Sequence, residues 1–279
     1  MEGDGMAVPV VALNNGVAMP QVGLGLAKVL PEQAAETVLA AFEAGYRSLD
    51  TAADYGNEAG VGTAIAWSGL PRSEVFVTSK VRNTDHGRGG TLQAARESLE
   101  RLGLERLDLY LIHWPVPGRD LYVETWHALE ELYAAGLARS IGVCNFGIGH
   151  LTRLLAESSV VPAVNQFELH PRLQQHELRQ FDAEHGIRTE AYSPFAKAQT
   201  LAEPELIALA ERRGVTSAQL VLRWHVQLGH IVIPKSAHPS RMRENLAALD
   251  LDPLSDEELA VFASLDTHER IGFSPEEFV

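Results

Sequence analysis

The feature that most constrains the fold of this chain is a regular alternation between short, β-rich apolar runs and longer segments with a helical pattern. Eight such runs recur between residues 21 and 233, and a helical segment follows each of them. Strict β/α alternation implies parallel strands joined by right-handed crossovers. Eight units within 279 residues therefore predict an α/β fold, a closed (β/α)8 TIM barrel, in one domain that spans residues 1–279.

Additional elements flank the barrel. Residues 8–19 predict a β-hairpin, because Asn14-Asn15-Gly16 tolerates the positive φ of a tight turn. The predicted strands are 21–25, 45–50, 75–80, 107–112, 140–143, 163–166, 187–191 and 231–233. The predicted helices are 31–44, 57–68, 91–102, 122–135, 150–157, 174–184, 203–213, 217–228, 239–248 and 256–265. The barrel is thus expected to carry an N-terminal β-hairpin and additional helices near the C-terminus.

An open, doubly wound parallel sheet is the alternative architecture. Such a sheet usually carries a glycine-rich turn after its first strand. Gly23-Leu24-Gly25 is too short for that turn, and the glycines of segment 56–62 have the wrong spacing and lie inside a helical pattern. The sequence therefore favours the closed barrel.

Composition and charge narrow the setting and the partners. The formal net charge of −14 argues against nucleic acid or an anionic membrane as a partner. The single cysteine, Cys144, allows no internal disulfide, which fits a reducing cytoplasm. Segment 1–5 does not resemble a secretory signal, and no uncharged apolar run approaches about 18 residues. We therefore expect a cytoplasmic monomer that acts on a small molecule.

Polar and ionisable side chains end most of the apolar runs. In a (β/α)8 barrel, the residues at the carboxyl ends of the strands meet at one mouth. Those residues are Asp50, Lys80, His113, Asn145, Gln166, Tyr192 and Lys235, with Tyr55 in the loop after Asp50. Singly, each has an ordinary structural explanation, such as an exposed loop lysine or a hydrogen-bonded core histidine. Together they predict a functional site at this mouth, and we expect no metal in it.

The chemistry of this set follows from its residue types. A phenol has an ordinary pKa of about 10, and a nearby ammonium lowers it. A buried ammonium in turn needs a carboxylate partner. Tyr55, Lys80 and Asp50 supply that series, and His113 can form a hydrogen bond to a carbonyl oxygen beside the phenol. General-acid chemistry at a carbonyl then needs a hydride source, which implies a reduced nicotinamide.

Several motifs give the chain a specific resemblance to a known family. They are Leu49-Asp50-Thr51-Ala52 with Tyr55-Gly56-Asn57-Glu58, Thr78-Ser79-Lys80, Asp108-Leu109-Tyr110-Leu111-Ile112-His113-Trp114-Pro115, Ser140-Ile141-Gly142-Val143-Cys144-Asn145-Phe146, Val164-Asn165-Gln166, Tyr192-Ser193-Pro194 and Ile233-Pro234-Lys235-Ser236. Over about residues 8–265 the chain resembles the aldo-keto reductases, most of all the bacterial branch that includes the 2,5-diketo-D-gluconic acid reductases. The resemblance implies NADPH-dependent reduction of aldehydes or ketones, with dicarbonyls and keto-sugar acids as candidate substrates.

The resemblance also implies roles for individual residues. It implies a catalytic tetrad of Asp50, Tyr55, Lys80 and His113, in which Tyr55 donates the proton. The implied NADPH/NADP site comprises Tyr192 stacked on the nicotinamide with Ser193 beside it, Cys144, Asn145 and Gln166 at the carboxamide, Lys235, Ser236 and Arg241 around the 2′-phosphate, and Glu244 and Asn245 near the adenine. The cations Lys235 and Arg241 suit a dianionic phosphate.

Three positions depart from the family pattern. Cys144 replaces a usual serine, Ala27 a common aromatic, and Arg82 a common tryptophan. The loss of two aromatics is expected to open the substrate pocket, where Arg82 either attracts a carboxylate or points to solvent. We expect Trp114 and a C-terminal tail, residues 266–279, to line the pocket as well; the alternative for the tail is an ordinary disordered terminus.

Two other classes of function stay open. Lys80 could form a Schiff base in an aldolase built on the same barrel. Alternatively, the protein could be a non-catalytic subunit that senses NADP(H). Tyr55, Lys235 and Arg241 have no role in the aldolase, and the complete tetrad argues against the sensing subunit.

Overall fold

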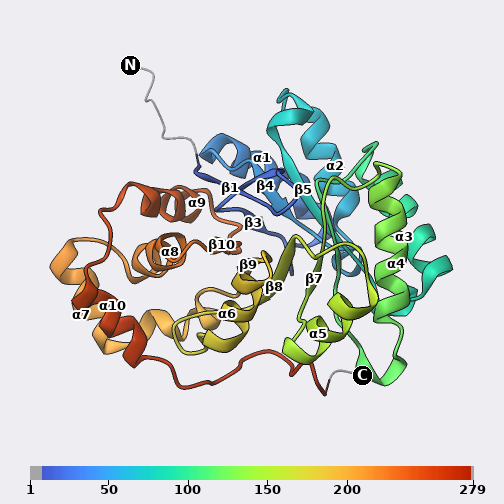
Figure 1. The fold of residues 1–279 in the computed structure, drawn as a ribbon. Coiled ribbons are helices and arrows are strands. Elements are labelled where there is room, and N and C mark those ends of the chain that lie inside the picture. The colour runs from blue at the N-terminus through green and yellow to red at the C-terminus, as the bar shows by residue number, and fades with distance from the viewer. Residues whose placement is uncertain (1–7, 278–279) are drawn as a thin grey trace.

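Eight parallel strands form the centre of the structure, a computed structural model that describes residues 8–277 (Figure 1). They are β3 (Leu24–Gly25), β4 (Ser48–Asp50), β5 (Phe76–Val81), β6 (Leu109–Ile112), β7 (Ile141–Cys144), β8 (Val164–Glu168), β9 (Arg188–Tyr192) and β10 (Ile231–Val232). Each pairs with the next in chain order. Val22 forms a parallel bridge with Val232, and the Gly23 amide donates to the Val232 carbonyl at 2.9 Å. These contacts join the first strand to the last, so the predicted closed barrel is confirmed.

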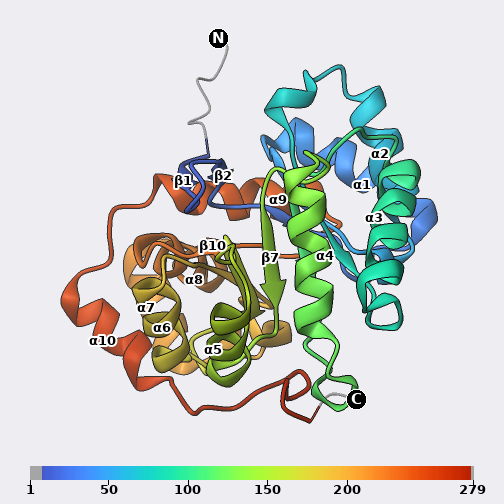
Figure 2. The same ribbon diagram turned by 45° about the vertical axis from the view of Figure 1, so that its right-hand side comes forward.

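The helices surround the barrel (Figures 1 and 2). They are α1 (Pro31–Ala44), α2 (Glu58–Trp67), α3 (Arg88–Leu102), α4 (Tyr122–Ala134), α5 (Ile148–Glu157), α6 (His176–Glu184), α7 (Pro204–Arg213), α8 (Ser217–Gln227), α9 (Pro239–Leu246) and α10 (Asp256–Ser264). Each predicted helix is confirmed with small differences at its ends. Within residues 8–277, no helix is long and apolar enough to cross a membrane.

Two element ends differ from the prediction for identifiable reasons. Helix α3 begins at Arg88 rather than at Thr91, because the Arg88 amide donates to the Glu124 carboxylate at 2.9 Å and this satisfies a free N–H of the first turn. Strand β8 continues past Gln166 to Glu168, where it pairs with Tyr192. Gln166 therefore lies inside the barrel, two residues before the strand ends.

The predicted N-terminal hairpin is confirmed and closes one end of the barrel. Strands β1 (Val10–Ala12) and β2 (Ala18–Pro20) pair antiparallel around Gly16, which has a φ of 83°. Leu13 and Met19 are buried against side chains inside the barrel, among them Leu109 and Leu111. The hairpin lies opposite the end toward which the β7 arrow points in Figure 2. The strands' carboxyl ends are thereby left as the open mouth.

Packing of α2 against α3 requires a glycine. A Cβ atom at Gly62 would overlap the carbonyl oxygen of Leu102, the last residue of α3. Backbone at such a distance cannot move aside as the tip of a side chain can. The close approach therefore depends on the missing Cβ.

We expect Gly62→Ala to destabilise the protein by about 1–3 kcal/mol, because the methyl group overpacks a backbone contact. Gly89→Ala is the matched control: Gly89 lies in α3, is exposed, and has no atom within 4 Å of its would-be Cβ. The control should be neutral or stabilising by up to about 1 kcal/mol. Urea unfolding of the three proteins measures both effects, and equal stabilities would show that α2 and α3 adjust freely.

Candidate active site

A buried ion pair lies at the centre of the barrel mouth. Lys80 on β5 places its Nζ 2.7 Å from Oδ1 of Asp50 at the end of β4, and it also donates to the Thr51 carbonyl at 3.0 Å. The Lys80 side chain is 0% exposed. Burial alone lowers the pKa of Lys80, but the charge and hydrogen bond of Asp50, together with the neighbouring Tyr55 and Cys144, outweigh burial and the net pKa is raised. Lys80 is therefore an ammonium at neutral pH.

Tyr55 lies beside this pair, in the loop that follows Asp50. Its ring centroid is 5.2 Å from Lys80 Nζ, and it makes an edge contact with the His113 ring at 5.7 Å between centroids. Burial raises the pKa of Tyr55 to about 12, although Lys80 acts to lower it. The expected influence of Lys80 is present, but the expected net lowering is wrong because desolvation is larger. The phenol thus keeps its proton at neutral pH.

The motif residues after Tyr55 hold its loop in place. The buried Asn57 donates from Nδ2 to the carbonyls of Leu26 and Val29, at 2.9 and 3.1 Å. Glu58 begins α2 and accepts from Ser79 Oγ at 2.6 Å. These contacts attach the loop to neighbouring βα units, so the motif fixes the position of the phenol through the tertiary fold.

His113 directly follows β6 and contacts a carboxylate that the sequence analysis did not single out. Its Nδ1 is 3.2 Å from Oδ2 of Asp54. Burial lowers the pKa of His113 even though Asp54 opposes the change, so the ring is neutral. The His113 contact lowers the pKa of Asp54. Since the ionised Asp54 can only accept, the contact places the ring hydrogen on Nδ1 and leaves Nε2 as an acceptor.

Arg82 is engaged at the rim of the mouth. Its Nη2 donates to the Ala53 carbonyl at 2.8 Å, and its Nε is 3.5 Å from Oδ1 of Asp54. Its side chain is 39% exposed. Arg82 thus neither points freely to solvent nor reaches into the mouth. It contacts Asp54, which in turn contacts His113.

A hydrogen-bonded layer lies beneath the mouth and is centred on Gln166. Its Nε2 donates to Oδ2 of Asp50 at 2.8 Å and to Oε2 of Glu190 at 2.9 Å. Its Oε1 faces the thiol of Cys144 at 3.5 Å, a weak donor. The Gln166 amide nitrogen therefore links two buried carboxyl groups. Its amide oxygen accepts only the weak hydrogen bond from Cys144 among residues 8–277 and keeps capacity to accept another.

Asn145 and Tyr192 are also held together. Tyr192 Oη donates to Asn145 Oδ1 at 2.7 Å, and Asn145 Nδ2 donates to the His113 carbonyl at 3.0 Å. Asn145 has a φ of 63°, a left-handed conformation that asparagine tolerates better than most residues. These contacts fix the orientation of the Tyr192 ring at the mouth.

Glu190, like Asp54, is a site residue that sequence reasoning missed. It is buried, and burial together with the neighbouring Asp50 raises its pKa to about 8. One ammonium, Lys80, faces two carboxyl groups here, so the second carboxyl holds a proton at neutral pH. The signal was available: in a strand, residues two apart share a face, and Glu190 precedes Tyr192 by two.

Two adjoining cavities run across the mouth. The first, of about 260 Å³, is lined by Gly25, Ala27, Asp50, Tyr55, His113, Trp114, Cys144, Asn145, Gln166, Tyr192, Ser193, Ile233 and Lys235. The second, of about 590 Å³, is lined by Ala27, Lys28, Ser193, Pro194, Phe195, Lys197, Ala198, Leu201, Ala218, Lys235, Ser236, Arg241, Glu244 and Asn245. They share Ala27, Ser193 and Lys235, so we treat them as one groove, called the mouth groove. Lys80 lies below its floor, and Arg82 does not line it.

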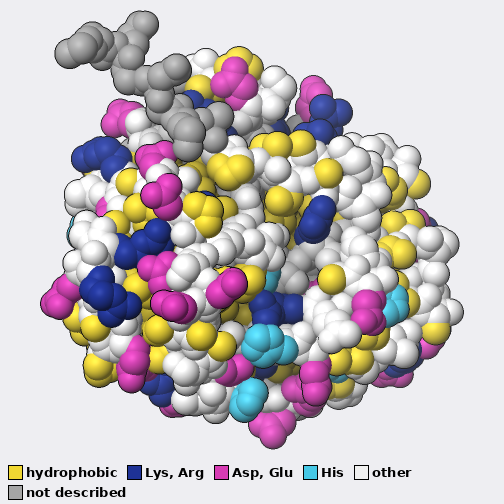
Figure 3. Space-filling model, turned by 60° about the vertical axis from the view of Figure 1, so that its left-hand side comes forward, with side chains coloured by type: hydrophobic (Ala, Val, Ile, Leu, Met, Phe, Trp, Pro, Cys, Tyr) yellow, Lys and Arg dark blue, Asp and Glu magenta, His cyan; other side chains and the backbone are white. Residues whose placement is uncertain are grey.

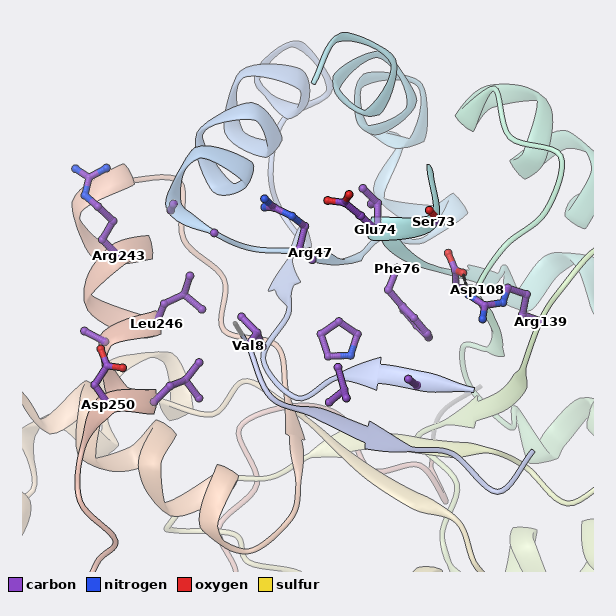
Figure 4. A pocket seen from close by; sticks show the side chains of 18 residues that line it. Val8, Arg47, Ser73, Glu74, Phe76, Asp108, Arg139, Arg243, Leu246 and Asp250 are labelled. Atoms are coloured by element: carbon purple, nitrogen blue, oxygen red, sulfur yellow. Dashed lines mark hydrogen bonds and ion pairs between the residues drawn. The ribbon is translucent and has the colours of Figure 1, made fainter. Parts of the chain in front are cut away.

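Another hollow lies away from the mouth. It measures about 720 Å³ and is formed by the hairpin, the start of β5 and α9, with Arg47, Glu74 and Phe76 among its lining (Figure 4). It contains none of the mouth residues. On the face drawn in Figure 3, acidic and basic side chains are interspersed, and no extended basic patch is present there.

A (β/α)8 barrel with a buried acid–base set at the carboxyl ends of its strands is the architecture of a barrel enzyme. The chain belongs to the aldo/keto reductase family, whose sequence model matches residues 19–267. It is therefore an oxidoreductase.

Individual relatives agree with this assignment. An aldo-keto reductase of Mycobacterium sp. (strain JLS) is 49% identical over 273 residues, which is 98% of this chain and 99% of the relative. The crystal structure of an aldo/keto reductase from Brucella melitensis is 46% identical, with a TM-score of 0.90 over 93% of this chain and 100% of that one. A mutant of Gox0644, solved in complex with NADPH, is 43% identical, with a TM-score of 0.93 over 97% of this chain and 98% of that one.

We expect Glu190→Gln to flatten the loss of stability between pH 5 and pH 8. The folded-state pKa of about 8 lies above the ordinary 4.5, so in this window the folded state keeps a proton that the unfolded state releases. The free energy of unfolding of the wild type then falls as pH rises, by at most about 1.4 kcal/mol per pH unit from this group. The amide keeps an acceptor for Gln166. Urea unfolding of both proteins at several pH values measures the difference, and parallel pH profiles would contradict the assignment.

Proposed function

We propose that this protein is an NADPH-dependent carbonyl reductase in which Tyr55 is the general acid. Its substrates are aldehydes or ketones, with dicarbonyls and keto-sugar acids as candidates. The observation that carries the proposal is the continuity of the mouth groove, which leads from Tyr55 and His113 in the inner cavity, past Lys235 where the two cavities meet, to Arg241 in the outer cavity. A single groove thus brings an acid–base set and a cationic anchor to one elongated ligand.

The donor and acceptor groups of the groove suit NADPH. Lys235, Ser236 and Arg241 offer charge and hydrogen bonds for a phosphate at the outer end. At the inner end the Tyr192 ring lines the cavity and offers a surface for stacking, and the Gln166 Oε1 can accept from a carboxamide because, among residues 8–277, its one hydrogen bond comes from the weakly donating Cys144 thiol. The NADPH complex of the Gox0644 mutant supports this choice of cofactor. Bound in the groove, NADPH supplies the hydride for the carbonyl carbon.

The protein's own residues supply the proton. Tyr55 carries its proton at neutral pH and lines the inner cavity, so it can donate from Oη to the carbonyl oxygen as negative charge develops there. The phenolate that results lies near the Lys80 ammonium, which Asp50 keeps charged. Solvent then returns a proton to Tyr55. The Lys80 ammonium stabilises negative charge on the Tyr55 oxygen only as the proton leaves. The interaction is therefore stronger in the transition state than in the ground state, as catalysis requires.

His113 lines the inner cavity, but in this geometry it is not set to donate a hydrogen bond to the substrate carbonyl. With its Nδ1–H directed at Asp54, the neutral ring presents Nε2 to the cavity as an acceptor. The sequence analysis expected a hydrogen bond from His113 to the carbonyl oxygen. That bond requires either a proton on Nε2 as well as on Nδ1, or loss of the Nδ1–Asp54 hydrogen bond so that the ring hydrogen can move to Nε2. Tyr55 is the donor that the geometry favours.

The two alternative functions are disfavoured by specific observations. A Schiff-base lysine reacts as the neutral amine and needs a lowered pKa. The pKa of Lys80 is raised, and its Nζ is hydrogen-bonded to Asp50 and Thr51. A sensing subunit would not need the arrangement of Tyr55 over Lys80.

Substrates enter beside Ala27 and Trp114, which line the inner cavity. Ala27 offers only a methyl group where the family commonly has an aromatic, so this side of the pocket is wide. Because Asp54 already pairs with Arg82, a substrate carboxylate would have to compete for that arginine. We propose that the C-terminal tail borders the same pocket. The cytoplasmic location and the monomeric state stay predictions.

Tyr55→Phe should reduce carbonyl turnover by at least about 10²-fold, because it deletes the general acid and keeps the ring. The dissociation constant for NADPH, followed by protein fluorescence, should stay within about twofold, since the ring still fills the floor of the groove. Tyr133→Phe on α4, outside the groove, is the matched control. If Tyr55→Phe turns over a standard aldehyde at the wild-type rate, Tyr55 is not the donor.

Arg241→Ala should weaken NADPH binding by about tenfold or more and leave NADH binding unchanged, because a hydrogen bond to a charged group contributes about 1.5–3 kcal/mol. Arg243→Ala on the same helix is the matched control, since Arg243 lines the hollow of Figure 4 instead of the groove. Fluorescence titration with both cofactors measures the effect. An equal loss for NADPH and NADH would place Arg241 away from the 2′-phosphate.

A further inference from the structure

The C-terminal tail, described to residue 277, crosses the mouth side of the barrel. From α10 it passes α6 and α5 and ends near α4 in both ribbon views (Figures 1 and 2). Its first part is tied to the loop after β8, because the amides of Thr267 and Glu269 both donate to the Arg172 carbonyl, at 3.1 and 3.2 Å. Arg172 also forms an ion pair with Glu269. This part of the tail therefore follows a defined path.

Beyond this anchor, one buried carboxylate holds two successive peptide groups of the tail. Glu168, the last residue of β8, accepts from the Ile271 amide through Oε1 at 2.7 Å and from the Gly272 amide through Oε2 at 2.8 Å. Its side chain is 0% exposed, and His170 Nε2 lies 3.0 Å from Oε1. Burial alone raises the pKa of Glu168, but these three hydrogen bonds outweigh burial and the net pKa is lowered. Glu168 is thus ionised at neutral pH, when its hydrogen bonds are strongest.

The same segment of the tail contacts residues that line the mouth groove. Lys197, which lines the outer cavity, donates from Nζ to the Ile271 carbonyl at 3.2 Å. A Cβ at Gly272 would lie 3.8 Å from the Tyr192 hydroxyl. Residues two apart on a strand share a face, so Glu168 continues the row that begins with Gln166 at the groove floor. The clamped peptide is therefore positioned by the elements that build the groove.

We propose that Glu168 is a positioning residue that clamps the Ile271–Gly272 segment at the rim of the groove and so sets which carbonyl substrates fit. The inference rests on the proposed reductase function and adds a determinant of its specificity. The clamp acts through backbone N–H groups and needs only that position 272 carries no Cβ. A tail so held contributes binding energy away from the reacting carbonyl and excludes water from it.

Two variants release the clamp from opposite sides. Glu168→Gln removes the charge and one of the two acceptor oxygens. Gly272→Ala leaves the barrel intact but places a methyl group 2.6 Å from Glu168 Oε2, which is too close for the hydrogen bond to persist. Gly272 does not have a left-handed φ, so alanine is compatible with its backbone. Glu277→Gln is the matched control, because it makes the same chemical change in the same tail at an exposed site.

Limited proteolysis with trypsin tests the clamp directly, without measuring the enzyme's own activity. The amide of Ile271 that Glu168 holds belongs to the Arg270–Ile271 peptide bond, which trypsin recognises. We expect cleavage at this bond, followed by mass spectrometry of the full chain, to be about tenfold faster or more in both clamp variants than in the wild type or Glu277→Gln, as the loss of a charged hydrogen bond predicts. Unchanged cleavage in both variants would overturn the clamp.

Kinetics with a small and a bulky aldehyde test its consequence. Both clamp variants should raise KM by about three- to tenfold and reduce the ratio of kcat/KM between the two substrates, with kcat and the NADPH dissociation constant within about twofold of wild type. If Gly272→Ala speeds cleavage but leaves KM and selectivity unchanged, the clamp does not set specificity. These outcomes are separate from failure of the proposed function, which would appear as absent carbonyl reduction in the wild type. Should Glu168→Gln fail to fold, Gly272→Ala still decides the matter.

Discussion

The buried ammonium of Lys80 is the constraint on which the rest of the site depends. A charge with no access to water is tolerated only where acceptors surround it. Asp50 and the Thr51 carbonyl provide them, and both come from the strand and loop beside β5. The barrel supplies this arrangement because adjacent parallel strands bring their carboxyl ends to the same edge. The position of Tyr55 over Lys80 follows from it.

Neutralisation of Lys80 extends further than its nearest partner. Gln166 on β8 joins Asp50 on β4 to Glu190 on β9, so two separate pairs of adjacent strands, β4–β5 and β8–β9, contribute to one polar layer. Its net charge stays near zero because Glu190 keeps a proton. A layer of this kind costs stability compared with an apolar core, and its benefit is a fixed, water-excluded electrostatic environment beneath the substrate.

The two ends of the barrel have separate functions. The hairpin fills one end with Leu13 and Met19, which pack on the apolar interior. The other end carries the mouth groove, and the tail crosses beside it. The clamp at Glu168 connects the tail to the mouth groove, since this residue of β8 holds the tail near Tyr192. Specificity can therefore change through the tail while the ion pair beneath stays intact.

The sequence by itself determined the barrel, the hairpin, the order of the elements and the residues that end most strands, because apolar periodicity and strand order are local properties that a closed parallel sheet converts into one mouth. Tertiary structure alone decided which partners those residues find. Arg82 pairs with Asp54, Gln166 turns its amide toward Asp50 and Glu190, and Glu168 holds Ile271. Such contacts join residues far apart in sequence and depend on how burial balances charge across several strands. The order of the strand ends predicted that Tyr55 and Lys80 share one mouth. The net pKa of the Tyr55 phenol was set by desolvation, which only the packed barrel imposes.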